Sequence, residues 1–284
     1  MNDKHELSAG ENSTNIQDSK NVTVNQYGLN YSDVKEICMM VFKSNFYDLG
    51  GTVQTIIEER AEEIINKYLK RLISKDPEAL KNTEDADLRF IIYEAQKNHA
   101  RRGDKEIADL LVDMLIERTV TKEETLVKIV YNEALEILPK LTSKQIDMLT
   151  VIFLLRNVNV GHVFRIDNLD NIMRVLIEFV PNEEFFYQHL QYTGCVSINM
   201  TSVDFIDELK NAYPSLVPVS HVNPYLVFKE NLRSIAPHLY GILEAMNETR
   251  VPKCILTSVG VAIALSNFKR KIGVGWDLGT WIKE

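Results

Sequence analysis

Cysteine is scarce in this chain of 284 residues. The three cysteines, Cys38, Cys195 and Cys254, lie far apart, with no CxxC pair and no histidine at metal-ligand spacing. This pattern excludes a disulfide scaffold and argues against a zinc site. A chain of this length buries a hydrophobic core without such cross-links. We therefore expect no metal or other cofactor and a reducing compartment.

Long hydrophobic runs are also lacking. The longest apolar stretches, 148–155 and 255–265, fall well short of the roughly 20 residues that span a bilayer. Residues 1–14 are polar and lack the apolar centre of a secretory signal. The sequence therefore predicts a cytoplasmic protein.

No catalytic motif is recognisable. The sequence has no GxSxG, no P-loop and no HExxH, and its six histidines are scattered. Gly273, Gly275 and Gly279 miss the dinucleotide-binding spacing by one residue and leave no room for a βαβ unit. We predict a protein without enzymatic activity, although an active site assembled from scattered side chains stays open as an alternative.

The charge is negative overall but uneven. The net charge of −8 disfavours a general nucleic-acid-binding protein. Residues 250–284, however, hold six Lys or Arg and two acidic residues, a local charge of +4. Lys269, Arg270 and Lys271 form a cluster at an expected helix end, where positive charge complements the helix dipole. The alternatives are contact with an acidic neighbouring subunit, with nucleic acid or with anionic lipid.

The fold class predicted is mainly α: a multi-helix bundle over 31–181 and a helix-rich α+β unit over 182–284. Ser32 and Thr52 are placed to open helices, and Thr142 with Gln145 and Thr121 with Glu124 match capping boxes. Helix 143–156 is apolar on all sides over 148–155, which is typical of the middle of a bundle. Asp167 is expected to cap a helix over 168–180. Short strands are expected at 195–198, 216–219 and 254–256, and Trp276 and Trp281 are expected to dock on the core.

The first 30 residues form a separate polar β-tract. Its two short alternating pieces, 14–17 and 21–26, predict a small hairpin or β-arch. Their apolar content is too small to offset the ordering entropy of about 20 residues at roughly 1–2 kcal/mol each, so a lone copy is expected to be disordered. Copies stacked in register would gain side-chain ladders and interdigitated aliphatic side chains. The interpretations are a disordered leader or a self-association tract. The residues expected to carry self-association are Asn15, Ile16, Gln17, Val22, Val24 and Asn25.

Four segments carry a resemblance to a family. They read NSTNIQDSKNVTVNQ, YSDVKEICMMVFKSNFYDL, ALEILPKLTSKQIDMLTVIFLLR, and LTSVGVAIALSNFKR with DLGTWI. Together they resemble a family of uncharacterised bacterial proteins that place the same polar tract before a helical body. Such tracts also resemble leaders of bacterial signalling and antiphage-defence proteins, where assembly of like subunits is the suspected use. The resemblance assigns no catalytic residue.

The sequence thus favours a homo-oligomeric scaffold, sensor or adaptor that assembles through its N-terminal tract. Its expected partners are further copies of itself and another protein of the same system. The alternative function is binding of nucleic acid or anionic lipid through Lys269, Arg270 and Lys271.

Overall fold

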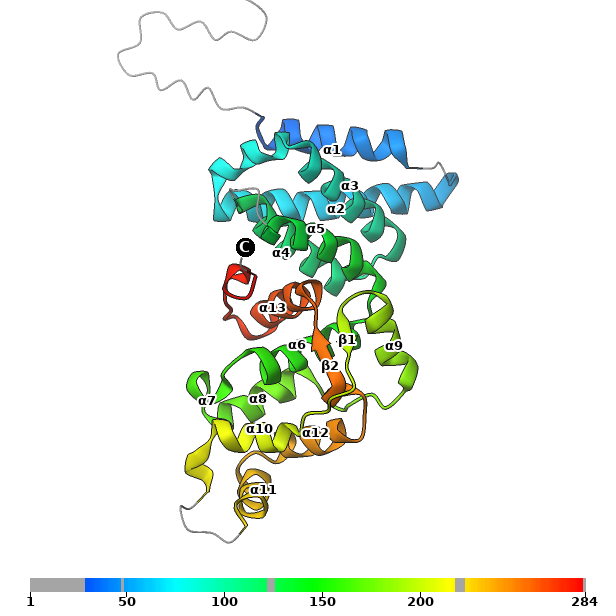
Figure 1. The fold of residues 1–284 in the computed structure, drawn as a ribbon. Coiled ribbons are helices and arrows are strands. Elements are labelled where there is room, and N and C mark those ends of the chain that lie inside the picture. The colour runs from blue at the N-terminus through cyan, green and yellow to red at the C-terminus, as the bar shows by residue number, and fades with distance from the viewer. Residues whose placement is uncertain (1–28, 47–48, 122–125, 218–222, 283–284) are drawn as a thin grey trace, which may run out of the picture.

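The computed structural model describes residues 29–46, 49–121, 126–217 and 223–282. The mainly helical prediction is confirmed, with strands limited in these ranges to one two-stranded sheet. Figure 1 shows three tiers: α1 to α5 lie at one end, α6 and α13 cross the middle, and α7, α8 and α10 to α12 form the other end.

The first tier is a group of helices joined by short connections. Its elements are α1 (Tyr31–Asn45), α2 (Gly51–Lys75), a 3-10 helix (Pro77–Glu84), α3 (Ala86–Arg102), α4 (Lys105–Val120) and α5 (Leu126–Ile137). Asn30, not the expected Ser32, caps α1, because its side chain accepts from the Ser32 and Asp33 amides while Asp33 accepts from the Asn30 amide. Likewise Gly50, rather than Thr52, precedes α2. The capping box expected at Thr121 includes Glu124, which lies outside the described residues.

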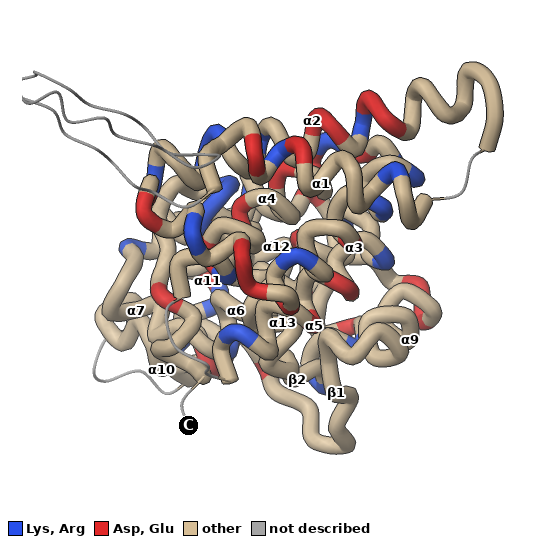
Figure 2. The backbone as a smooth tube through the Cα atoms, turned by 90° about the horizontal axis from the view of Figure 1, so that it is seen from above, with Lys and Arg blue, Asp and Glu red and all other residues tan. Residues whose placement is uncertain are grey.

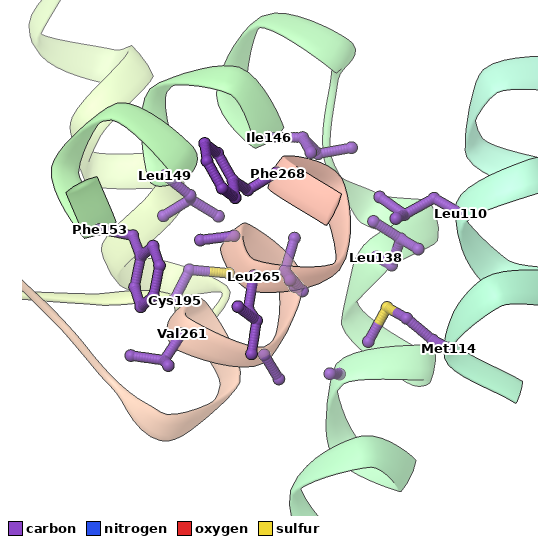
Figure 3. Close-up of a cluster of buried hydrophobic side chains, with 14 of the residues drawn as sticks. Leu110, Met114, Leu138, Ile146, Leu149, Phe153, Cys195, Val261, Leu265 and Phe268 are labelled. Atoms are coloured by element: carbon purple, nitrogen blue, oxygen red, sulfur yellow. The ribbon is translucent and has the colours of Figure 1, made fainter. Parts of the chain in front are cut away.

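Helices α6 (Ser143–Asn157) and α13 (Ser258–Ile272) form the centre of the molecule. The capping box expected at the start of α6 is confirmed, since Thr142 and Gln145 each accept from the amide of the other. Thr257 caps α13 by accepting from the Gly260 amide at 3.1 Å. Figure 3 shows Val261, Leu265 and Phe268 of α13 facing side chains of α6. Helix α6 is buried on all sides over residues 148–154, as its apolar run predicts.

The rest of the chain forms the third tier, the sheet and helix α9, which lies beside the sheet (Figure 1). The helices are α7 (Val160–Val163), α8 (Ile166–Leu176), α9 (Glu184–Tyr192), α10 (Phe205–Ala212), α11 (Pro224–Ile235) and α12 (Pro237–Asn247). Strands β1 (Val196–Ile198) and β2 (Cys254–Leu256) pair antiparallel, with Val196 opposite Leu256. Two of the strand predictions are therefore confirmed.

Two local expectations in this region are wrong. Leu216 lies in a 3-10 helix (Pro214–Leu216) rather than a strand, because Pro214 fixes a turn in which the Leu216 amide donates to the Tyr213 carbonyl. Residues 218–219 of that expected strand lie outside the described residues. Asp167 does not cap α8, since the helix already begins at Ile166 and Asp167 lies in its first turn, paired with Arg165.

One continuous hydrophobic core runs through all three tiers. It joins side chains from both sides of the expected boundary at residue 181, because α13 packs on α6, α5 and α4. Trp276 and Trp281 dock on this core as expected, with Trp276 stacked on Phe268 and the Trp281 ring edge-on to Phe153. Within the described ranges, no helix has the combination of length and apolar character needed to cross a bilayer.

Candidate functional site

The basic cluster predicted from the sequence lies at the C-terminal end of α13. The helix ends where Gly273 adopts the left-handed conformation, with φ of 81°, which glycine accepts without strain. The three basic side chains contact two different helices. Lys269 and Arg270 point to α4, whereas Lys271 points to α6.

Helix α4 meets this cluster with an acidic stripe. Asp109, Asp113 and Glu117 are spaced four residues apart, so they lie on one face of the helix. Lys269 Nζ lies 2.8 Å from Glu117 Oε1, and Arg270 Nη1 lies 3.4 Å from Asp109 Oδ2.

A second basic stripe, on α2, lines the other side of the same acidic residues. Lys67, Arg71 and Lys75 follow the same four-residue spacing. Arg71 bridges Asp109 at 3.1 Å and Asp113 at 2.8 Å, while Lys75 Nζ lies 2.7 Å from Glu117. Figure 2 shows acidic and basic stretches alternating along α2. The acidic residues of α4 thus lie between basic residues of α2 and basic residues of α13. We call these charged residues together the charged seam: Lys67, Arg71, Lys75, Asp109, Asp113, Glu117, Lys269 and Arg270.

The charged seam lines a cavity of about 320 Å³ whose walls include Arg71, Lys75, Lys269 and Arg270. Burial opposes ionisation of Glu117, but the ammonium groups of Lys269 and Lys75 more than offset it and lower the pKa of this carboxyl. For Asp113 burial prevails and raises the pKa, although Arg71 lies beside it. Basic side chains outnumber acidic ones here, and this surplus offsets the partial negative charge where α2, α4 and α13 end.

Lys271 belongs to a polar network between α6 and α13. Its Nζ lies 2.6 Å from Asp147 Oδ1, which also accepts from the Asn267 amide at 3.0 Å. The same Asn267 amide group donates to Thr150 Oγ1 at 2.9 Å. Asn267 is buried, so these bonds satisfy a polar group inside the core and fix α13 against α6.

The predicted self-association residues, 15–17, 22, 24 and 25, lie outside the described residues. The described chain begins close to them, at Leu29, which packs against the core. The following helix α1 is fixed to α2 by Tyr31, whose hydroxyl donates to Asn66 at 2.8 Å, and by Lys35, which pairs with Glu62 at 2.6 Å. A segment before residue 29 is therefore joined to a firmly held helix.

The acidic stripe of α4 is the functional feature that sequence reasoning missed. The signal was present, because carboxylates at 109, 113 and 117 repeat every four residues within and directly after the mainly apolar segment 107–116. What could not be read from the sequence is that α2 and α13 both face this stripe.

Other reactive groups carry no evident chemistry. The described residues bring no three His, Cys, Asp or Glu side chains together as a metal site would require. The three cysteines are free and buried, and burial raises the pKa of Cys38 and of Cys254 to about 11. His99 is buried near Glu63, and burial lowers its pKa.

A family model described as ":-like" matches residues 28–223 and 220–282. The chain belongs to this family. The two matches together extend over the helical body, and the ":-like" description assigns the family no activity. The expected membership of an uncharacterised family is therefore confirmed for the body of the chain. No curated protein and no solved structure matches the chain.

Proposed function

We propose that this protein is a non-enzymatic scaffold, sensor or adaptor of a bacterial signalling or defence system, and that its subunits assemble through residues 12–26. In this proposal identical strands from several subunits pair side by side. Their Asn and Gln side chains form ladders, and their aliphatic side chains interdigitate. The residues that carry the pairing are Asn15, Ile16, Gln17, Val22, Val24 and Asn25.

The observation that carries the proposal is the position of this tract. It has few charges, no proline and a β-branched centre, and it directly precedes a helix that Asn30 caps and Tyr31 and Lys35 hold to α2. Backbone pairing of the tract would therefore bring whole helical bodies together rather than loosely tethered ones.

The charged seam favours assembly over the alternative function. Each member of the predicted basic cluster has a carboxylate partner within 4 Å in the same chain, on α4 for Lys269 and Arg270 and on α6 for Lys271. Phosphates of nucleic acid or lipid would therefore compete with those carboxylates for the same positive charges. Nucleic-acid or anionic-lipid binding through Lys269, Arg270 and Lys271 is thus the second candidate, and Lys269, with its half-exposed side chain, is its best-placed residue.

Light-scattering mass of the full chain beside a chain starting at Leu29 tests the proposal. This start keeps the Asn30 cap of α1, so the truncated body retains its first helix intact. We expect a defined oligomer for the full chain and a monomer after truncation. Equal masses would overturn the proposal.

A point substitution sharpens the same test. Val24→Asp places a charge in every copy of the proposed ladder and should abolish the oligomer. Val175→Asp makes the same change at an exposed position of α8, where Val175 is 56% exposed, and should leave the mass unchanged. For the second candidate, replacing Lys269, Arg270 and Lys271 by Glu should abolish a salt-sensitive association with DNA or anionic vesicles.

A further inference from the structure

A cleft of about 390 Å³ opens between the end of α6 and helix α10. The segment 155–160 forms one wall and α10 forms the other. At one end of the cleft the backbone of Gly161 lies directly against the backbone of Ala212. A Cβ atom on Gly161 would lie 2.0 Å from the Ala212 carbonyl oxygen. Only glycine permits this approach of the α7 backbone to α10, so the width of the cleft is fixed by the main chain.

Arg156 lines this cleft with an unpaired charge. Its Nη2 donates to the Pro252 carbonyl at 2.7 Å, and its guanidinium lies 5.7 Å from the centre of the Phe205 ring. Its Nε is buried without a hydrogen-bond partner. Among the described residues Arg156 forms no ion pair within 4 Å. Burial lowers its pKa, while the negative charge of Glu208, which lines the same cleft, acts in the opposite direction.

Arg118, which is buried, has side-chain partners that the partly buried Arg156 lacks. Arg118 pairs with Asp87 at 2.6 Å, and its Nε donates to Asn132 at 2.9 Å. Arg156 keeps donors to spare, and an acceptor from outside the chain would satisfy them.

The rest of the cleft offers the opposite charge and amides. Glu208 of α10 lines the same space and forms no ion pair within the described part of the chain. Asn157, Asn159 and Asn211 contribute side-chain amides, which both donate and accept hydrogen bonds. A cation and an anion that line one cleft without forming an ion pair with each other suit a ligand that carries both charges. A phosphate dianion would be repelled by Glu208.

We propose that this cleft binds a small zwitterion of the amino-acid or dipeptide class. The ligand carboxylate lies against the Arg156 guanidinium, and its ammonium group lies against Glu208. The asparagine amides bond the remaining polar atoms. This binding is independent of the N-terminal tract, so the proposed assembly and the proposed ligand stand or fall separately.

Thermal unfolding of the full chain tests the proposal, with each of the proteinogenic amino acids and glycylglycine added in turn. A ligand that binds only the folded state raises the melting temperature. We expect such a rise with at least one of these zwitterions, and no rise with acetate, ethylamine or inorganic phosphate. Titration calorimetry with the best zwitterion should then show binding weakened about tenfold or more by Arg156→Gln.

Three variants make the result decisive. Arg165→Gln removes an arginine whose side chain is 82% exposed and lies outside the cleft lining, so binding should persist. Glu208→Gln and Asn211→Ala change exposed side chains of the cleft, and each should weaken binding even if Arg156→Gln unfolds the chain. The proposal is overturned if no zwitterion raises the melting temperature, if acetate or phosphate acts equally well, or if binding survives these cleft substitutions.

Discussion

Asp170 caps a helix that begins far along the chain from it. Its Oδ1 accepts a hydrogen bond from the Leu239 amide at 2.7 Å, and its Oδ2 accepts from Arg174 Nε at 2.9 Å. Leu239 lies in the first turn of α12, whose own N-cap position is Ala236 and supplies no side-chain bond. A carboxylate on α8 thus replaces the local cap that α12 lacks and joins the two helices.

Asp170→Ala should therefore destabilise the protein. Asp170 is buried, and its loss leaves the Leu239 amide without a partner in the core, which costs about 1–3 kcal/mol. Urea denaturation of the variant and the parent measures the difference in the free energy of unfolding. Asp167→Ala removes an exposed carboxylate from the same helix and should change the free energy of unfolding much less than Asp170→Ala does. Equal effects of the two substitutions would contradict the assignment of Asp170 as a cap.

This relationship shows where sequence reasoning stops. Local signals were read correctly at Thr142 with Gln145 and over strand Cys254–Leu256, because in both cases the deciding residues are neighbours in sequence. The cap of α12 joins residues 69 positions apart, and no local pattern points to it. At Leu216 the expected strand failed for another reason: this residue closely follows Pro214, which starts a 3-10 helix instead.

The charged seam was predictable in part. The four-residue spacing of Lys67, Arg71 and Lys75 and that of the α4 carboxylates are both visible in the sequence. The spacing on a single helix does not show which charges of another helix will face it. Ion pairs between helices depend on which faces meet, and that is decided by the packing of the apolar stripes.

The cysteines should be unreactive in the folded protein. The pKa of about 11 for Cys38 and Cys254 keeps both thiols protonated at neutral pH, and burial also raises the pKa of Cys195. Iodoacetamide at about pH 8 should label none of the three in the native protein and all of them in urea, as read by intact mass. Fast labelling of any one of them without urea would show that its surroundings open readily.

Glu117 should make stability depend on pH. Its pKa is lowered in the folded state, so folding favours the ionised carboxyl. The stabilisation is therefore present at pH values above the ordinary carboxyl pKa. It is lost as the pH falls through the lowered pKa of the folded state. Glu117→Gln should therefore reduce the free energy of unfolding at about pH 7 and have a much smaller effect at about pH 3. Urea denaturation at both pH values measures this.

Lys75 and Lys269, which both pair with Glu117, provide the control for this prediction. Lys75→Met and Lys269→Met each remove one of its ammonium partners, so each should reproduce part of the loss at neutral pH. In the Glu117→Gln background the same lysine substitutions should have little further effect. A loss from Glu117→Gln that is equal at both pH values would instead indicate altered packing.

Two glycines in helices should respond to alanine with opposite signs. A Cβ atom on Gly260 would lie 2.1 Å from the Cys195 carbonyl oxygen, where the first turn of α13 packs on the backbone before β1. Gly260→Ala must push these elements apart, which costs about 1–3 kcal/mol. A Cβ atom on Gly241 of α12 meets nothing within 4 Å, so Gly241→Ala gains helix propensity of about 0.5–1 kcal/mol.

Thermal unfolding of both variants beside the parent should give a lower melting temperature for Gly260→Ala and a higher one for Gly241→Ala. Stabilisation by Gly260→Ala would mean that α13 does not sit against the Cys195 backbone in solution.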